Sequence, residues 1–201
     1  MQREPTVCDL SPGEFTGRLD QLLAVYAAAM RPPAETLPGR RSIMAGHSAY
    51  PGFRALTVDG PGGPVAFGYG FHGAAGQWWH DTVARALADS GRGGAAAAAA
   101  WLDDCLEVAE LHVMPGYQGR GLGGTVLQRL TSGRQERTAV LSTRDAPTRA
   151  RRLYRGVGFT DLLTAFAFFP GGEPPYAVMG AELPLREWTP GRPRSASPSR
   201  W

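Results

Sequence analysis

A strand, a glycine-dense turn and a helix follow one another at residues 106–131, and this order restricts the possible folds more than any other feature. Residues 106–113 have the apolar character of a buried strand, and residues 122–131 repeat leucine and valine along one side of a helix. Between them, four glycines lie within residues 119–124. Backbone N–H groups at the start of a helix are unpaired and partly positive, and glycine lets a bulky anion approach them closely. The segment therefore predicts a turn able to bind phosphate.

The rest of the chain predicts a mixed α/β (α+β) domain, because strands and helices alternate without an internal repeat. Strands are expected at 6–10, 53–58, 65–71, 138–142, 159–169 and 176–183, and helices at 15–30, 40–49, 78–88 and 147–157. Residues 73–104 are interpreted as an insertion, since their six consecutive alanines favour helix but have little side chain to bury. We expect one domain over residues 1–183 and a disordered Pro/Ser/Arg-rich tail over residues 184–201.

The charge distribution excludes several classes of function. All 21 basic side chains are arginine, and residues 186–201 carry the net charge of +3, so the body is near neutral. A neutral body argues against a nucleic-acid-binding face. No apolar run approaches the ~20 residues of a membrane span, and the N-terminus lacks a signal core, so we expect a cytoplasmic protein with no membrane partner. Cys8 and Cys105 lack metal-ligand spacing and are expected to be reduced thiols, with no metal site.

The glycine turn has three interpretations. The chain holds 27 glycines, so a turn without a ligand can arise by chance. Gly119, Gly121 and Gly124 also match the dinucleotide fingerprint G-x-G-x-x-G. That fingerprint needs its first glycine almost directly after a strand within a βαβ unit, whereas residues 114–118 intervene here. This spacing argues against a dinucleotide site.

The third interpretation is a family resemblance, carried by two motifs in order. They are Gln118-x-x-Gly121-x-Gly123 and Ala150-x-x-Leu153-Tyr154-x-x-x-Gly158-Phe159. Together they resemble the GNAT family of acetyl-CoA-dependent N-acetyltransferases. The resemblance implies a mixed, mostly antiparallel central sheet with helices on both faces, and acetyl-CoA as cosubstrate. One position departs from the pattern: the family often has a cofactor-contacting Asn where Pro147 stands, and proline cannot donate that bond.

The resemblance also implies a set of residues that bind coenzyme A. The glycine turn would hold the pyrophosphate, with Arg120 able to add a bidentate contact. The main chain around Leu111 and Val113 would pair with the pantetheine arm, and the Val113 N–H would polarise the thioester carbonyl. The full expected set is Leu111, His112, Val113, Gln118, Gly119, Arg120, Gly121, Leu122, Gly123 and Gly124.

Two acidic or basic side chains on the strand are candidates for proton transfer. Strand alternation places Glu110 and His112 on one face, together with Leu106 and Val108. Glu110 is a candidate general base, since a carboxylate in a central strand is costly to desolvate unless it is used or paired. The alternative is an acid paired with an Arg or a hydroxyl. His112 is either a rival base or a hydrogen-bonded neighbour.

Tyr154 is the candidate acid, because the family places a tyrosine here to protonate the departing thiolate; a core tyrosine is the alternative. The expected function is direct acetyl transfer from acetyl-CoA to a primary amine of a small molecule or peptide. A non-catalytic acyl-CoA-binding sensor or regulatory module remains as the second hypothesis. Acceptor identity and oligomeric state stay open, a homodimer included. Residues 78–81 could wall the acceptor pocket or anchor the insertion, and the arginines of residues 149–155 suggest a solvated or phosphate-facing surface.

Overall fold

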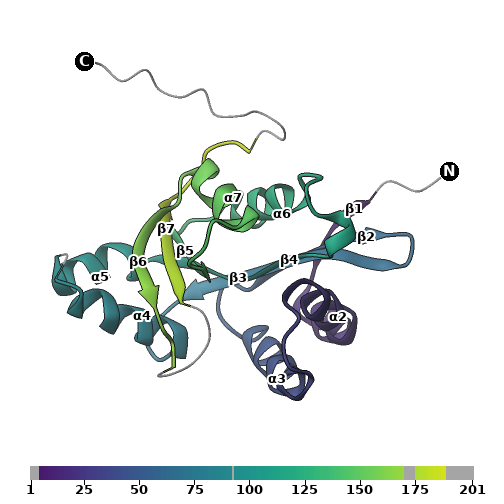
Figure 1. Ribbon diagram of the computed structural model, residues 1–201, viewed down its shortest axis with the longest axis horizontal. Coiled ribbons are helices and arrows are strands. Elements are labelled where there is room, and N and C mark those ends of the chain that lie inside the picture. The colour runs from purple at the N-terminus through teal and green to yellow at the C-terminus, as the bar shows by residue number, and fades with distance from the viewer. Residues whose placement is uncertain (1–4, 92, 170–174, 189–201) are drawn as a thin grey trace.

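A seven-stranded mixed sheet forms the centre of the protein, in the strand order β1-β2-β3-β4-β5-β7-β6 (Figure 1). The computed structural model describes residues 5–91, 93–169 and 175–188. The strands are β1 (Thr6–Leu10), β2 (Arg54–Gly60), β3 (Gly63–Gly73), β4 (Cys105–Val113), β5 (Thr138–Arg144), β6 (Thr160–Phe166) and β7 (Tyr176–Glu182). Only β4 and β5 pair in parallel, and every other neighbouring pair is antiparallel. The predicted fold class is confirmed.

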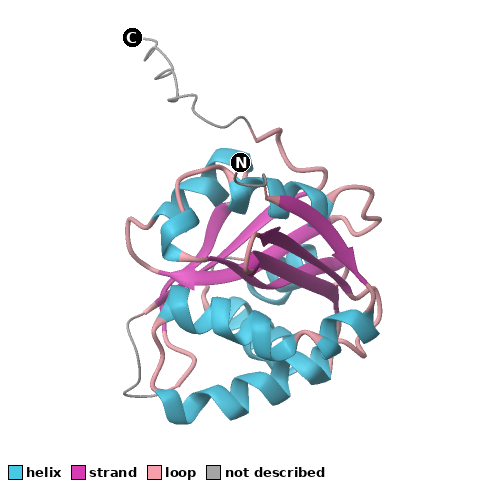
Figure 2. Ribbon diagram, turned by 90° about the vertical axis from the view of Figure 1, so that its right-hand side faces the viewer, coloured by secondary structure: helices cyan, strands magenta, loops and turns pink. Residues whose placement is uncertain are grey.

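Helices cover both faces of this sheet (Figure 2). Helices α6 (Leu122–Thr131) and α7 (Arg149–Val157) lie on one face. The other face is covered by α1 (Pro12–Gly17), α2 (Leu19–Met30) and α3 (Leu37–His47), and further along by α4 (Trp78–Asp89) and α5 (Gly94–Leu102). Short 3-10 turns, η1 (Ala34–Thr36) and η2 (Pro115–Tyr117), complete the order. Within the described part of the chain, no helix is long and apolar enough to cross a membrane.

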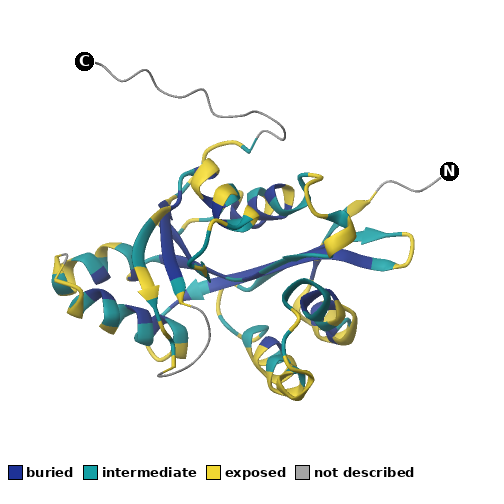
Figure 3. Ribbon diagram, viewed as in Figure 1, coloured by how far each residue is buried: buried dark blue, intermediate teal, exposed yellow. Residues whose placement is uncertain are grey.

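The core is divided by the sheet, so that the central strands are buried on both sides (Figure 3). One cluster packs α6 and α7 against Leu106, Val108 and their neighbours. A second packs α2 and α3 against Phe67, Tyr69 and Phe71 of β3. A third packs α4 and α5 against β5 and β7. The region predicted as an insertion therefore covers part of one sheet face, over β5 and β7.

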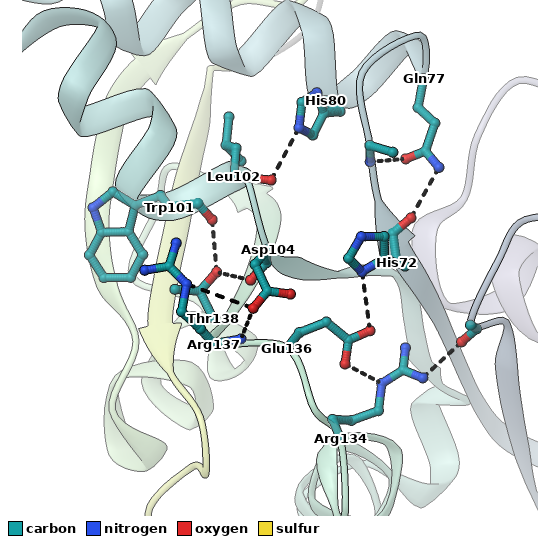
Figure 4. Close-up of polar contacts among 12 residues, drawn as sticks. His72, Gln77, His80, Trp101, Leu102, Asp104, Arg134, Glu136, Arg137 and Thr138 are labelled. Atoms are coloured by element: carbon teal, nitrogen blue, oxygen red, sulfur yellow. Dashed lines mark hydrogen bonds and ion pairs between the residues drawn. The ribbon is translucent and has the colours of Figure 1, made fainter.

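Strands β4 and β5 are joined at one end only. Their pairing runs from Cys105 opposite Thr138 to Glu107 opposite Val140 and then stops, although both strands continue. Polar contacts fasten the closed end: the Thr138 hydroxyl donates to the Trp101 carbonyl at 2.8 Å (Figure 4). Nearby, two ion pairs hold the segment that leads into β5, and they join Glu136 to His72 and to Arg134. Beyond Glu107, the edge of β4 that faces β5 has no strand partner.

A β-bulge in β4 changes which side chains share a face. Tyr69 of β3 lies opposite Glu110, but the next residue, Gly70, lies opposite Val108, so Ala109 is the extra residue. The expectation that Leu106, Val108, Glu110 and His112 share one face is therefore wrong. The first two pack toward α6 and α7, while Glu110 and His112 lie on the face of α2 and α3. The extra residue reverses the alternation, and no single-strand pattern shows it.

Several boundaries also differ from the expected ones. The helix expected at 15–30 is two helices, because a capping box between Ser11 and Glu14 starts α1 early and the backbone breaks at Arg18. Helix α7 begins at Arg149 with Thr148 as its cap, so Pro147 precedes the helix and is not in its first turn. The strand expected at 159–169 ends at Phe166.

The segment after β7 is packed where a disordered tail was expected to begin. The Arg186 N–H donates to the Val157 carbonyl of α7, and the Gln128 side chain of α6 donates to the Arg186 carbonyl at 2.8 Å. Leu185 and Trp188 pack on the same core cluster. The folded part therefore extends to at least Trp188, and residues 189–201 of the expected tail lie outside the described residues.

The bulge gives a test of the β3–β4 register. A Cβ on Gly70 would lie 2.5 Å from the Glu107 carbonyl oxygen, so Gly70→Ala must force the two strands apart. We expect a loss of about 1–3 kcal/mol in the free energy of unfolding, measured by urea denaturation. Gly39→Ala in α3 is the control, because nothing lies within 4 Å of its added methyl, and it should stabilise by about 0.5–1 kcal/mol. Equal stabilities for the two variants would contradict this register.

Candidate functional site

The glycine turn presents a row of unused backbone donors. Gly119 and Gly121 have positive φ angles of 79° and 83°, and Gly121 caps α6 without a side-chain cap. The first bond inside the helix runs from the Thr125 N–H to the Gly121 carbonyl. Within the described residues, the N–H groups from 119 to 124 donate to no other protein group. The turn is thus a positively polarised cup with its donors available to an anion.

The open edge of β4 continues from this cup. The Met114 N–H donates to the Val65 carbonyl of β3, so by alternation the N–H groups of Val113 and Leu111 point the other way, toward β5. The Gln118 side-chain amide donates to the Val113 carbonyl at 3.1 Å, which ties the turn back to the strand end. A linear ligand with amide groups can therefore extend from the cup along β4.

The structure places His112 differently from the other expected coenzyme-binding residues. Its backbone pairs with Phe67 of β3, and its imidazole lies on the α2 side, edge-on to Tyr26 at 5.1 Å. Neither its main chain nor its side chain faces the open edge of β4. Its contact with Glu110 confirms that it is a hydrogen-bonded neighbour of that residue.

Two guanidinium groups flank the glycine turn. Arg120 lies over the Tyr117 ring at 5.1 Å, and Arg149, at the start of α7, lies near Gly119. The other arginines of α7 are engaged elsewhere. Arg151 is buried and forms ion pairs with both Asp145 and Asp161, and Arg155 also pairs with Asp161. The expectation of a solvated or phosphate-facing surface is therefore wrong for Arg151.

The last glycines of the turn have packing roles that the sequence does not reveal. A Cβ on Gly124 would lie 2.2 Å from the Trp188 indole, so this glycine is required by close approach of the C-terminal segment. A Cβ on Gly123 would lie 3.5 Å from Leu153 of α7, and Leu122 packs on the same core cluster. Their N–H groups still face the start of the helix, where an anion can reach them.

Glu110 is a buried, paired carboxylate. Arg40 of α3 donates to one oxygen at 3.0 Å, and His112 contacts the other. Burial acts to raise the pKa of Glu110, but the contacts with His112 and Arg40 outweigh it, so this pKa lies below its ordinary value. Arg40 is itself fixed by stacking on the Tyr26 ring at 5.1 Å. The sequence could not identify Arg40 as the partner, because it is 70 residues away.

Glu107 is the acidic residue that sequence reasoning missed. It is only 4% exposed, and its Oε2 atom has no hydrogen-bond partner among the described residues. Burial, followed by the charge of Glu110, raises the pKa of Glu107 to about 8. It stands where the pairing of β4 with β5 ends, opposite Val140. An unpaired carboxyl inside a strand was visible in the sequence, but its face depends on the bulge.

Tyr154 is buried in α7, 6% exposed and packed beside Phe159. Burial, and then the charge of Glu110, raise the pKa of its phenol above the usual range. The helix lies on one sheet face and the Glu110 side chain on the other. A neutral phenol at this position can donate a proton.

The residues considered as a pocket wall are divided between packing and surface. His80 is buried and contacts the Leu102 carbonyl at 3.2 Å, which anchors α4 to α5. Trp79 donates to the Ser142 hydroxyl of β5 at 3.2 Å. Trp78 is exposed and stacks on exposed Phe169. Cys8 and Cys105 are free thiols, and no described group of His, Cys, Asp and Glu side chains could hold a metal ion.

Comparison with known sequences agrees with this geometry. Residues 78–161 match the family model described as an acetyltransferase (GNAT) domain. The GCN5-like protein acetyltransferase Rv2170 from Mycobacterium tuberculosis is 35% identical over 203 aligned positions, which cover 88% of this chain and 97% of that relative. The similarity therefore extends far beyond the glycine turn.

Solved structures share the fold at low sequence identity. The ribosomal-protein-S18-alanine N-acetyltransferase from Escherichia coli has a TM-score of 0.61 and 16% identity, covering 95% of this chain and 100% of its own. The yncA protein from Salmonella typhimurium, in a structure with its cofactor acetyl-CoA, has a TM-score of 0.60 and 15% identity. The alignment covers 98% of this chain and 100% of the yncA chain. At these identities the likeness concerns the fold alone.

The raised pKa of Glu107 predicts a pH-dependent stability. Its folded pKa of about 8 exceeds the ordinary 4.5, so the folded state keeps a proton that the unfolded state releases. The stabilisation that this proton gives is fully present below the pKa of the unfolded state. It is lost as the pH rises through the pKa of the folded state. Wild type should therefore lose roughly 3–4 kcal/mol more than Glu107→Gln between about pH 5 and pH 9. Urea denaturation measures this difference, and parallel pH profiles would contradict it.

Proposed function

Because the chain belongs to the GNAT family of acetyltransferases, we propose that it transfers an acetyl group directly from acetyl-CoA to a primary amine. The observation that carries the proposal is the row of free backbone donors in residues 119–124, continuous with the unpaired edge of β4. A diphosphate fits the first part and an extended amide-bearing arm fits the second. Acetyl-CoA combines both, and it supplies an activated acetyl thioester.

The proposed binding residues follow from this arrangement. The N–H groups of residues 119–124 would hold the pyrophosphate, with Arg120 and Arg149 as nearby cations. The main chain of Leu111 and Val113 would pair with the pantetheine arm. The Val113 N–H would then donate to the thioester carbonyl oxygen, where negative charge develops during transfer.

We propose Glu107 as the general base. An acceptor amine must lose a proton to attack, and a base works best when its pKa is near the operating pH. Glu107 has a free oxygen and a pKa raised to about 8. Glu110, the base expected from the sequence, is held by Arg40 and His112 with a lowered pKa, which makes it the weaker base.

Tyr154 is proposed as the acid that gives its proton to the departing sulfur. Its phenol stays protonated because its pKa is raised by burial. It belongs to α7, whose N-terminal part lies beside the glycine turn at Arg149 and Leu153. No protein nucleophile is needed in this scheme, and burial raises the pKa of the Cys105 thiol to about 12, which makes it a poor one.

The acceptor is proposed to be an amine, with peptide amines tested first. The relative at 35% identity is a protein acetyltransferase, so lysine side chains and peptide N-termini lead the panel, followed by polyamines and amino acids. A sensor that binds acyl-CoA without turnover has no observation in its favour, since both a free carboxyl and a phenol are present.

Thiol release tests the activity and its residues together. When purified protein is mixed with acetyl-CoA and an acceptor, it should liberate the free thiol of coenzyme A. A colorimetric thiol reagent measures this release. With the best acceptor, Glu107→Gln and Tyr154→Phe should each lower kcat by about 10²-fold, the usual contribution of a positioned base or acid. Trp78→Ala, at an exposed position, is the control. Thiol release that no acceptor stimulates would refute the transferase assignment.

The coenzyme cup can be tested without an acceptor. Gly121→Asp places a negative side chain among the backbone donors, at a residue whose φ is 83°. We expect calorimetric binding of coenzyme A to weaken by at least about 10²-fold. Gly133→Asp is the matched control, since Gly133 also has a positive φ of 69° but lies at the other end of α6. An unchanged affinity in Gly121→Asp would exclude the cup as the phosphate site.

A further inference from the structure

Two buried carboxyls share one face of β4 because of the bulge. Glu107 and Glu110 are three residues apart, which in a regular strand places them on opposite faces. The extra residue, Ala109, brings them to the same face. Their cross-strand partners show this, because Glu107 lies opposite Phe71 and Glu110 lies opposite Tyr69. These two partners are two residues apart on β3 and belong to one core cluster. The two carboxyls are therefore neighbours at the spacing of an ordinary same-face pair.

The surroundings of the two carboxyls differ sharply. Glu110 is 8% exposed and has both oxygens engaged, one by Arg40 at 3.0 Å and the other by His112. Arg40 is clamped between this carboxylate and the Tyr26 ring. Glu107 is 4% exposed, and its Oε2 has no partner among the described residues. One carboxyl is built to be charged and the other is not.

We infer that Glu110 is a positioning residue for Glu107: burial already favours the protonated form of Glu107, and the clamped negative charge of Glu110 beside it strengthens that preference, so that Glu107 is poised to exchange its proton with an acceptor amine. This inference rests on the proposed function for its second half, since the exchange matters only in an acetyltransferase. The first half concerns the protein alone.

The physical reason is the repulsion of like charges in a poorly solvated place. Two neighbouring carboxylates in one buried site cannot both ionise cheaply, and the proton stays on the one with fewer partners. Arg40 and His112 settle that choice in favour of a charged Glu110. The groups that face the pair are Cys105 on β4, Tyr69 on β3, and Arg40 and His47 on α3.

Protonation can be followed directly, without an acceptor, by NMR of protein containing glutamate labelled at its side-chain carboxyl carbon. Glu107→Gln and Glu110→Gln assign the two signals by their disappearance. In wild type, the Glu107 signal should titrate with a midpoint near 8, and the Glu110 signal should stay at its ionised position over the same pH range. A Glu110 signal that is protonated near neutral pH would overturn the inference.

The decisive variant is Glu110→Gln, which keeps the shape and an oxygen for Arg40 but removes the charge. The Glu107 midpoint should fall by roughly 1–2 pH units, because the variant removes a neighbouring like charge from a poorly solvated site. Asp20→Asn is the matched control, since it removes an exposed carboxylate that pairs with Arg41 and should leave the midpoint unchanged.

The kinetic readout separates this inference from the proposed function. With an acceptor in hand, the acid limb of kcat/KM in Glu110→Gln should move to lower pH together with the NMR midpoint. Loss of transfer at every pH, with an unmoved Glu107 midpoint, would make Glu110 itself the base and overturn the inference. Wild type without transferase activity would refute the proposed function, while the NMR midpoints would still decide the role of Glu110.

Discussion

The separation of β4 from β5 is the constraint on which the rest of the site depends. Two parallel strands that are fastened at one end and free at the other leave backbone donors and acceptors along an open edge. Buried backbone groups need partners, so such an edge is costly unless a ligand supplies them. One of these groups, the Val113 carbonyl, accepts a hydrogen bond from the Gln118 side-chain amide. What remains is an edge suited to an amide-bearing ligand, leading to a helix start suited to its phosphates.

The bulge at Ala109 is the second constraint on the site, because it determines which face of the sheet each β4 side chain occupies. Without it, Glu110 and His112 would point into the apolar layer under α6 and α7, and Glu107 alone would face α2 and α3. With it, both carboxyls lie on the face away from the glycine turn. In the proposed function, the phosphate-binding turn and the proposed base therefore lie on opposite faces of the sheet.

The parts of the site that could be predicted from sequence are those set by local interactions. The turn and helix at residues 118–131 follow from glycine conformation and apolar spacing, which involve neighbours within a few residues. The paired state of Glu110, the face on which Glu107 is buried and the need for Gly124 all depend on distant partners: Arg40, the β3 register and Trp188. A strand pattern assumes perfect alternation, so one inserted residue reverses every assignment beyond it.

The unequal environments of Glu107 and Glu110 also explain why a near-neutral protein places two acids in a central strand. A single buried carboxyl with no partner has a raised pKa, because burial disfavours its charged form. A single carboxyl paired with arginine would stay charged but hold protons too weakly to take one from an ammonium group. When the two are placed side by side, the charge of the paired acid raises the pKa of the unpaired one further, to about 8, which we propose suits it to take a proton from a cationic amine. The clamp formed by Arg40 and His112 then matters for chemistry because it decides which of two identical side chains carries the charge.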